Sequence, residues 1–398
     1  MTDGFTEGQD DKTSVLAVPS QAPTEEADTR PRVVLLGSGD LSRELAIALG
    51  RLGASVIAVD ERPTEAVADQ SLTVPLTDAD ELTRAIRGVR PDFVVTTTDT
   101  VAPQALEGLE GAQLVPGARA VRLAADREGL RRLAADELGL PTAPFWFVGS
   151  LGELEAVGAH AGYPLLVKPV LAAAGRGQSV ASGPDDIAAA WQRATGGHGE
   201  QHRVLAETVV EVEFYVTLLA VRSDGPQGPV IDFCTPIGHS EGLESWQPQQ
   251  LSPAASDAAK SIAARIVKAL GGRGVFGVEL MINGDEVYFA DVTPRPADSA
   301  WVTVRSQRLS VFDLQARTIL GLPVDTMMIS PGAARRVQRA DGPAAALAGA
   351  LAVPESDLRA VGRGYQALAT APDVAAARER AREVANRLTQ RPRYDPSS

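Results

Sequence analysis

Residues 274–296 read GVFGVELMINGDEVYFADVTPRP, and their apolar residues alternate on both sides of an Asn-Gly-Asp turn at 283–285. This pattern predicts a β-hairpin. Cross-strand partners then have numbers that sum to about 569, so Glu279 faces Ala290 and is a neighbour of Asp291. Two such carboxylates would be costly in a core without a cation, and Mg²⁺ favours one or two carboxylates with phosphate oxygens. The hairpin therefore predicts a metal site, unless the two acids point to opposite faces and are solvated.

Two further segments carry cations suited to phosphate chemistry. In KPVLAAAGRGQ, residues 168–178, a strand delivers Lys168, and the Ala/Gly loop offers backbone N–H groups that a phosphate can approach closely. Arg176 could add a charge-assisted contact. The loop lacks the G-K-[ST] ending of a Walker loop, and a mobile surface hairpin is the alternative. Arg295, just beyond the acidic hairpin, is suited to stabilising charge on a transferring phosphoryl group.

The run VLAETVVEVEFYVTLLAV, residues 204–221, predicts one long β stretch. Glu207 opens a Glu-x-x-Val run within it. Such a run suits an adenine clamp, in which backbone groups bond the edge of the base and the carboxylate accepts hydrogen bonds from the sugar hydroxyls. Ordinary strand sequence without a ligand is the alternative.

The N-terminal third begins with RVVLLGSGD, continues with a helical pattern and returns to a strand at SVIAVD. This order predicts a doubly wound α/β unit over residues 32–118. The turn at 37–42 lies between strand and helix, where a phosphate or ribose could meet the helix N-terminus. Asp60 closes the second strand as in a dinucleotide-binding fingerprint, but Ser42 stands in place of the third glycine. Nicotinamide binding therefore competes with a structural turn or a different ligand.

Composition limits the class of protein. The 398 residues carry a net charge of −13, with 44% hydrophobic and 22% charged residues, which is typical of a globular chain with more than one packed unit. The acidic balance argues against nonspecific nucleic-acid binding. Cys234 is the single cysteine, which excludes an intrachain disulfide and a thiolate metal cluster. An acidic N-terminus and the lack of an apolar run of membrane length predict a cytoplasmic protein that does not bind membranes, with residues 1–31 as a disordered tail.

From residue 331 the sequence predicts Ala-rich helices, a strand at YQALAT (365–370) and an amphipathic helix at 373–390. The basic run AARRVQRAD, residues 333–341, is interpreted as an exposed turn. The four histidines show no zinc-binding spacing and are interpreted as structural or solvated: His160, His198, His202 and His239. A position lining a pocket is the alternative for His239.

The lysine, the glycine loop, the Glu-x-x-Val run and the paired acids before P-R-P follow in an order that resembles the ATP-grasp pattern. Longer stretches, among them LLGSGDLSRELAIALGRLGASVIAVD, DREGLRRLAADELGLPT and ESWQPQQLSP, resemble the formate-dependent phosphoribosylglycinamide formyltransferase family of purine synthesis. The resemblance implies an ATP-grasp fold with α/β and α+β parts. Its implied divisions are a tail at 1–31, an N-terminal α/β domain at 32–118, an ATP-grasp domain at 119–330 and a small C-terminal domain at 331–398.

The same resemblance implies that ATP phosphorylates formate to formyl phosphate, which the amine of glycinamide ribonucleotide then attacks, with Mg²⁺ as cofactor in a homodimer. The implied nucleotide ligands are Arg127, Lys168, Ala173, Ala174, Gly175, Arg176, Gly177, Gln178, Glu207, Thr208, Val209, Val210 and Tyr215. The implied metal ligands are Glu279 and Asp291, the transition-state arginine is Arg295, and the substrate residues are Asp40, Leu41, Asp298 and Arg363.

The chain also departs from the family pattern. Asp291 and Tyr215 each stand in place of a glutamate, and the acid expected after the third strand is Thr97, with Asp99 two residues on.

The basic cluster expected to bind the substrate phosphate is smaller than in the family. Glu355 stands near an expected lysine, and Arg363 alone remains of an arginine pair. Arg335, Arg336 and Arg339 would replace that cluster if they turned inward. The alternatives are therefore a ligase for another carboxylate and amine, or a nucleotide-binding regulator without turnover.

Overall fold

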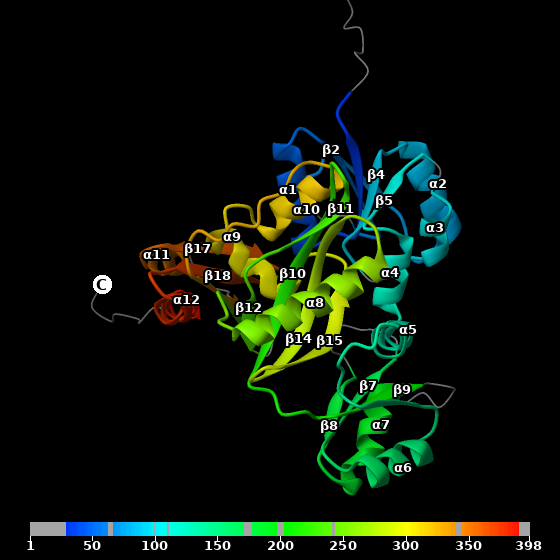
Figure 1. Cartoon of the computed structure of the whole chain (residues 1–398). Helices are drawn as coiled ribbons and strands as arrows, with labels where there is room; N and C mark the ends of the chain where they lie inside the picture. The colour runs from blue at the N-terminus through cyan, green and yellow to red at the C-terminus, as the bar shows by residue number, and fades with distance from the viewer. Residues whose placement is uncertain are drawn as a thin grey trace, which may run out of the picture. The chain divides into compact units, whose positions relative to one another are not determined.

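Five parallel strands form the first sheet, in the order β3-β2-β1-β4-β5; β2, β4 and β5 are labelled in Figure 1. Alternate residues of β1 enter different apolar cores, Val33 and Leu35 on one face and Val34 and Leu36 on the other, so helices cover both faces. The predicted doubly wound α/β unit is confirmed. Its elements are β1 (Arg32–Leu36), α1 (Asp40–Arg51), β2 (Ser55–Asp60), β3 (Gln70–Thr73), α2 (Ala79–Val89), β4 (Phe93–Thr96), α3 (Pro103–Glu107) and β5 (Gln113–Val115). The computed structural model describes residues 29–62, 67–98, 100–109, 111–170, 177–196, 203–240, 243–338 and 344–389.

The turn from β1 to α1 lies where the strand order reverses, with β2 on one side of β1 and β4 on the other. Doubly wound sheets bind ligands at this point. Gly37 has a φ of 111°, and a Cβ at this position would lie 2.7 Å from Oγ1 of Thr97. The turn approaches β4 so closely that only glycine fits at this position.

Four strands in the order β6-β9-β7-β8 form a small sheet, and its core also contains residues of helices α6 and α7. The two strands predicted around the 168–178 loop are present, since β7 ends at Pro169 and β8 begins at Ser179. The elements of this region are α4 (Ala118–Ala125), α5 (Arg127–Arg132), the π-helix η1 (Leu133–Glu137), β6 (Phe145–Val148), α6 (Leu151–Ala161), β7 (Leu165–Pro169), β8 (Ser179–Ala181), η2 (Pro184–Asp186), α7 (Ile187–Thr195) and β9 (Val204–Thr208).

The third sheet has nine strands along the path β15-β14-β10-β12-β13-β16-β18-β17, with β11 paired to β10. Helix α8 lies across β10, β14 and β15 (Figure 1), where it packs on Val216, Leu218 and Ala220. The elements are β10 (Phe214–Gly225), β11 (Gly228–Phe233), β12 (Ile237–Ser240), β13 (Glu244–Gln247), α8 (Pro253–Leu270), β14 (Gly274–Asn283), β15 (Glu286–Thr293), η3 (Asp298–Val302), α9 (Thr303–Ser306), α10 (Val311–Ile319), β16 (Gly332–Val337), α11 (Ala344–Leu351), β17 (Ser356–Val361), β18 (Gly364–Thr370) and α12 (Val374–Thr389).

The nine-stranded sheet continues past residue 330. Strands β16, β18 and β17 extend it beyond β13, so residues after 331 complete the sheet that the preceding region begins. The boundaries at 118 and 330 remain predictions.

The predicted single β stretch at 204–221 is wrong. Strand β9 ends at Thr208 in the small sheet, and β10 begins at Phe214 in the large one. Between them the N–H of Val209 donates to the carbonyl of Pro164, and that of Glu213 donates to the carbonyl of Ile282. Strand propensity is the same on both sides of this crossing, because it reports no partner strand.

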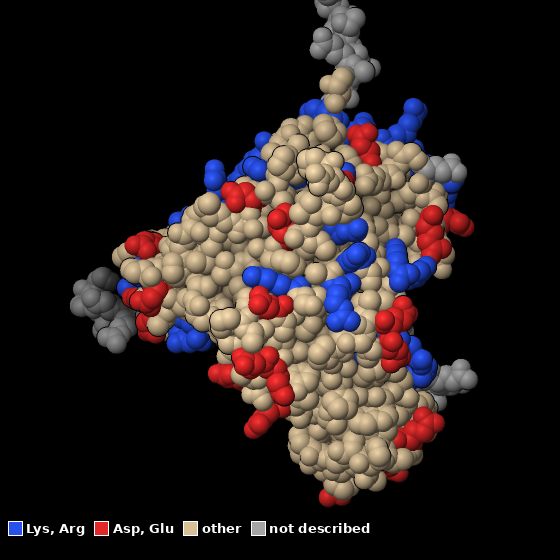
Figure 2. Space-filling model, viewed as in Figure 1, with Lys and Arg blue, Asp and Glu red and all other residues tan. Residues whose placement is uncertain are grey.

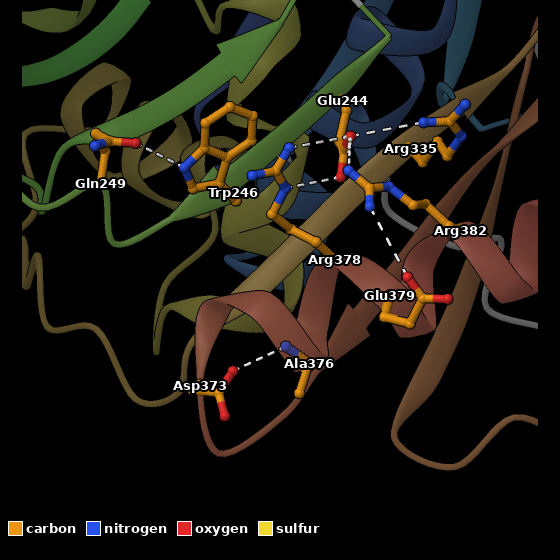
Figure 3. Close-up of polar contacts among 9 residues, drawn as sticks. All are labelled: Glu244, Trp246, Gln249, Arg335, Asp373, Ala376, Arg378, Glu379 and Arg382. Atoms are coloured by element: carbon orange, nitrogen blue, oxygen red, sulfur yellow. Dashed lines mark hydrogen bonds and ion pairs between the residues drawn. The ribbon is translucent and has the colours of Figure 1, made fainter. Parts of the chain in front are cut away.

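The interpretation of residues 333–341 as an exposed basic turn is also wrong. Gly332–Val337 form strand β16, paired with β13 and β18. Successive side chains of a strand point to opposite faces, so Arg335 and Arg336 diverge. Arg335 lies 3.6 Å from the carboxylate of Glu244, on the face that α12 covers (Figure 3). Arg339 lies outside the described residues.

Candidate active site

A cavity of about 840 Å³, called the large cavity below, lies on the sheet face opposite α8. Five strands of the large sheet contribute Glu279, His239, Ser245, Arg336 and Gln366, which share this face by their register. The remaining wall comes from the β1–α1 turn, the residues after β4 and the segment after β15. The large cavity therefore joins the N-terminal sheet to the nine-stranded one.

Five predicted site residues line the large cavity, although more than 250 positions separate the first from the last. The predicted substrate residues lie at two places, the start of α1 and the start of η3. One predicted metal ligand lies on β14, and the predicted transition-state arginine lies between β15 and η3. These residues are Asp40, Leu41, Glu279, Arg295 and Asp298.

Glu279 has no arginine or lysine partner among the described residues. One carboxylate oxygen accepts a hydrogen bond from the hydroxyl of Thr217 at 2.8 Å, and the other lies 2.8 Å from Nε2 of His239. The hydroxyl of Thr217 also lies 2.6 Å from that of Ser299. A carboxylate that faces a cavity with so little positive charge beside it is suited to binding a cation.

A β-bulge sets the position of the second acid. From Asn283 to Leu280 the hairpin follows the predicted register, but Ala290 is an extra residue, and Glu279 pairs directly with Asp291. Directly opposite residues of an antiparallel pair point to the same face. This register favours a shared face, although Glu279 lines the large cavity and Asp291 lines the small one.

Asp291 lines a small cavity of about 130 Å³ together with Arg127, Lys168 and Gln178. Burial raises the pKa of Asp291, while a hydrogen bond from the N–H of Val292 and the charges of Arg127, Arg131 and Lys168 act to lower it. Burial outweighs these contacts, so the carboxylate has too little positive charge around it. A bound cation would supply that charge.

Glu207 joins the small cavity to the adjacent strands. Its buried carboxylate pairs with Lys168 at 2.5 Å and, closely, with Arg131. Arg131 also donates to the carbonyls of Phe289 and Ala290, at 3.3 and 3.2 Å. One buried guanidinium therefore connects the predicted adenine clamp with the bulge beside Asp291.

The other predicted nucleotide residues are partly engaged elsewhere. The N–H groups of Thr208 and Val209 donate to the carbonyls of Pro144 and Pro164, so a base edge could use only their carbonyls. Tyr215 is half-exposed, and its ring centroid lies 6.2 Å from that of His239. Val210 lies after β9 and Gly177 lies before β8; the structure gives neither residue a contact that indicates a role. Ala173, Ala174, Gly175 and Arg176 lie outside the described residues.

The first βα turn is held by its own acids and hydroxyls. The carboxylate of Asp60 accepts the N–H of Ser38 in a close hydrogen bond, so it braces the turn. Thr97, which stands at the position of an expected acid, lines the large cavity and bonds the hydroxyl of Ser42 at 2.6 Å. Asp99 lies outside the described residues. The polar wall here is neutral except for Asp40, which pairs with Arg43 at 3.0 Å.

The predicted phosphate ligand Arg363 is exposed in the two-residue turn between β17 and β18, and it is not among the described residues that line the large cavity. Arg336 lines that cavity instead. Glu355, near the position of an expected lysine, pairs with Arg380 at 2.7 Å.

Sequence reasoning did not favour four of these residues as site residues. His239 was interpreted as structural, with a pocket-lining position as the alternative, and it contacts Glu279. Arg336 was interpreted as part of an exposed turn, with a role in binding the substrate phosphate as the alternative. Arg131 and Thr217 carried no signal, because the contacts that define them come from other strands and helices.

The donor set fits Mg²⁺. Within the described ranges no three His, Cys, Asp or Glu side chains surround a common point. A Mg²⁺ ion held by Glu279 and Asp291 would take its other ligands from phosphate oxygens and water, as Mg²⁺ prefers.

The surface is mixed in charge. On the face in Figure 2, basic side chains lie across the middle and acidic side chains are spread around them. No described helix is long and apolar enough to cross a membrane.

Comparison with known proteins places these features in a group. The ATP-grasp domain family matches residues 133–312. The formate-dependent phosphoribosylglycinamide formyltransferases of Rhodococcus jostii (strain RHA1) and Corynebacterium glutamicum (strain R) are 44% and 45% identical to this chain; the alignments cover 90% and 92% of it and 94% and 95% of the relatives.

Solved structures agree. The glycinamide-RNase-transformylase T structure from Mycobacterium tuberculosis is 65% identical, with a TM-score of 0.80, over 89% of this chain and 99% of that one. The N5-carboxyaminoimidazole ribonucleotide synthetase of Thermotoga maritima has a TM-score of 0.76 at 20% identity, over 89% of this chain and 98% of that one. The second likeness shows the fold alone.

Proposed function

Because the chain belongs to the formate-dependent phosphoribosylglycinamide formyltransferase family, an ATP-grasp enzyme family of purine biosynthesis, we propose that it formylates phosphoribosylglycinamide. The observation that carries the proposal is the large cavity, on which Asp40, Glu279, Arg295 and Asp298 converge from distant parts of the chain. The small cavity with Lys168 adjoins the same hairpin and supplies the nucleotide side.

The reaction has two steps. A formate oxygen attacks the γ-phosphorus of ATP, the bond from that phosphorus to the β–γ bridging oxygen breaks, and ADP leaves. The amine nitrogen of phosphoribosylglycinamide then attacks the formyl carbon, phosphate leaves, and the nitrogen gives up a proton. An acyl phosphate intermediate would be hydrolysed in open water, so both steps require an enclosed site.

The chain's own residues divide between these steps. Lys168 and Arg127, at the small cavity, are suited to binding nucleotide phosphates. Arg295 is suited to stabilising charge on the transferring phosphoryl group. Asp40 and Asp298 offer carboxylates to the hydroxyls and amine of the ribonucleotide.

The proposal includes Mg²⁺ held by Glu279 and Asp291, supported by their direct pairing and by the burial that raises the pKa of Asp291. The ion would neutralise charge on the nucleotide phosphates. Glu207 to Val210 and the residues 173–178 are proposed for the remaining nucleotide contacts.

We also propose a cytoplasmic homodimer. Leu322, Met327 and Ile329 are apolar, exposed and close in sequence, which suits a subunit contact. Sedimentation of the purified protein would show a dimer that Met327→Asp and Ile329→Asp together dissociate; a monomeric wild type would contradict this part.

The test of function is ADP release with ATP, formate and phosphoribosylglycinamide, with the formylated product identified by mass spectrometry. Release that requires both small substrates supports the proposal. Release with formate but another amine, found in a carboxylate-by-amine screen, would indicate a related ligase. ATP binding without release under any pairing would indicate a regulator.

A further inference from the structure

We propose that Arg336 binds the phosphate group of the ribonucleotide substrate, at the end of the large cavity remote from Glu279. The inference deepens the proposed function and rests on it, since phosphoribosylglycinamide carries a phosphate several bonds from its reacting amine. The sequence offered Arg336 only as one of three arginines that would replace the phosphate-binding cluster if they turned inward, and the arginine expected from the resemblance, Arg363, is not among the described residues that line the cavity.

The charges of the cavity leave a phosphate few partners. Among the lining residues that the structure describes, the only arginines are Arg295 and Arg336, and none is a lysine. The lining acids are Asp40, Glu244, Glu279 and Asp298. Arg295 lies two residues after the strand that carries Asp291, and the proposed function assigns it to the phosphoryl-transfer step. Arg336 is the cation that remains for a second anion.

Arg336 lies far enough from the reacting centre to serve this role. Along the sheet, β10, β12 and β13 lie between β14, which carries Glu279, and β16, which carries Arg336. Four strand spacings correspond to about 19 Å along the sheet. A ligand bound by its phosphate at Arg336 would therefore extend toward Glu279 with its amine end leading.

The surroundings of Arg336 hold the guanidinium without neutralising it. Nη2 donates to the carbonyl of Val361 at 3.1 Å, and among the described residues no carboxylate forms an ion pair with Arg336. Asp40, which accepts the N–H of the neighbouring Gly362 at 3.0 Å, already pairs with Arg43. Gln366, the cross-strand partner of Arg336, also faces the cavity and adds an amide donor.

Gly362 provides the space for this arrangement. Its φ is +58°, and a Cβ at this position would lie 3.5 Å from Nη2 of Arg336. A larger side chain would extend over the guanidinium. The guanidinium of Arg336 thus lies beside the turn that contains Arg363, so it can perform the role expected of a cation from that turn.

The neighbouring arginine is a matched control. Arg335 has the same side chain, the same strand and the adjacent position, but it faces Glu244 on the opposite side of the sheet. Steady-state kinetics of wild type, Arg336→Ala, Arg336→Lys and Arg335→Ala would be measured with phosphoribosylglycinamide and with the same glycinamide riboside lacking phosphate.

Losing one charge-assisted contact to an anion should raise the KM for phosphoribosylglycinamide about 10- to 100-fold in Arg336→Ala. The KM values for ATP and formate should not change, and activity on the riboside should equal that of wild type. Arg336→Lys should recover part of the loss, and Arg335→Ala should change neither KM. Inorganic phosphate should compete with the ribonucleotide in wild type and compete more weakly in Arg336→Ala.

Two failures are distinguishable. A KM for phosphoribosylglycinamide in Arg336→Ala within about twofold of wild type, or an equal loss on ribonucleotide and riboside, overturns the assignment of Arg336 alone. A wild type that neither formylates phosphoribosylglycinamide nor binds it by calorimetry overturns the proposed function as well. Melting temperatures of all variants show whether a loss reflects unfolding.

Discussion

Glu244 and Glu279 are two glutamates whose strand positions put them on opposite faces of the same sheet. Both are among the residues that line the large cavity, but their surroundings are opposite. Glu244 is 5% exposed and contacts three arginines, Arg335, Arg378 and Arg382 (Figure 3). Glu279 is 26% exposed and contacts a hydroxyl and an imidazole. Arginines balance the charge of the Glu244 carboxylate, which we expect to stabilise the fold. The Glu279 carboxylate, which faces the large cavity, has little positive charge beside it.

Glu207 is an intermediate case. It is as buried as Glu244, but both of its cations, Arg131 and Lys168, also line the small cavity. A nucleotide phosphate that engages Lys168 would compete with Glu207 for the ammonium. The three glutamates thus differ in whether the cations that contact them can also bind a ligand.

The largest expected effect comes from Glu279→Gln. A neutral amide is a poor Mg²⁺ ligand. Mutating a residue that only hydrogen-bonds to a metal ligand typically lowers metal affinity or activity about 10–100-fold, so replacing a direct ligand should lower turnover at least about 100-fold. The melting temperature should not fall, since no arginine depends on this carboxylate. Turnover measured across a Mg²⁺ titration tests this; activity within a few-fold of wild type at an unchanged melting temperature would sink the metal assignment.

Lys168→Ala should raise the KM for ATP about 10- to 100-fold, because a hydrogen bond to a charged group contributes about 1.5–3 kcal/mol. ATP should also protect residues 172–178 of wild type, and not of this variant, from proteolysis and amide exchange. Lys260→Ala, an exposed lysine on α8, serves as the control. Equal protection of the segment with and without ATP would contradict a nucleotide role.

Glu244→Gln should act on stability instead of catalysis. Breaking a buried pair typically costs about 3–5 kcal/mol, and the partial exposure of the three arginines reduces the expected loss to about 2 kcal/mol. The melting temperature should fall by a few degrees while kcat at 25 °C stays within about twofold of wild type. An unchanged melting temperature, or a large fall in kcat while the variant remains folded, would contradict the structural role of Glu244 that distinguishes it from Glu279.

The smallest expected effect is in the pH dependence of stability. Burial alone would raise the pKa of Glu244, but hydrogen bonds and charges from Arg378 and Arg382 outweigh it and lower the pKa. Its stabilisation is therefore complete above the unfolded pKa, near 4.3, and is lost as pH falls through the lower folded value. The difference in melting temperature between wild type and Glu244→Gln should shrink from pH 7 toward pH 3.5. A difference that grows on acidification would mean the opposite shift.

Local pattern was sufficient for much of the fold. The buried run of β1, the glycine at the first turn and the hairpin at 274–296 each carry their signal within a few residues, so the doubly wound unit and the hairpin followed from the sequence. Lys168 and Glu279 were also predicted as site residues from the sequence, since a charged residue in an apolar strand has few structural reasons to be present.

Pairing between distant segments was not visible in the sequence. The run at 204–221 has uniform strand propensity, although its two halves belong to different sheets. The bulge at Ala290 shifts the register by one residue, so that Asp291 pairs with Glu279. A bulge is defined only by comparison with the partner strand, so the sequence of one strand does not reveal it.

The sequence by itself determined which residues carry charge and chemistry, because composition and short-range periodicity are properties of the chain alone. Only the tertiary structure decided what each charge contacts. Arg335 and Arg336 are identical neighbours in sequence, yet one is neutralised by Glu244 and the other faces a cavity. That difference comes from the alternation of side chains on a strand whose two faces meet α12 and the β1–α1 turn, and both of these lie far away in the sequence.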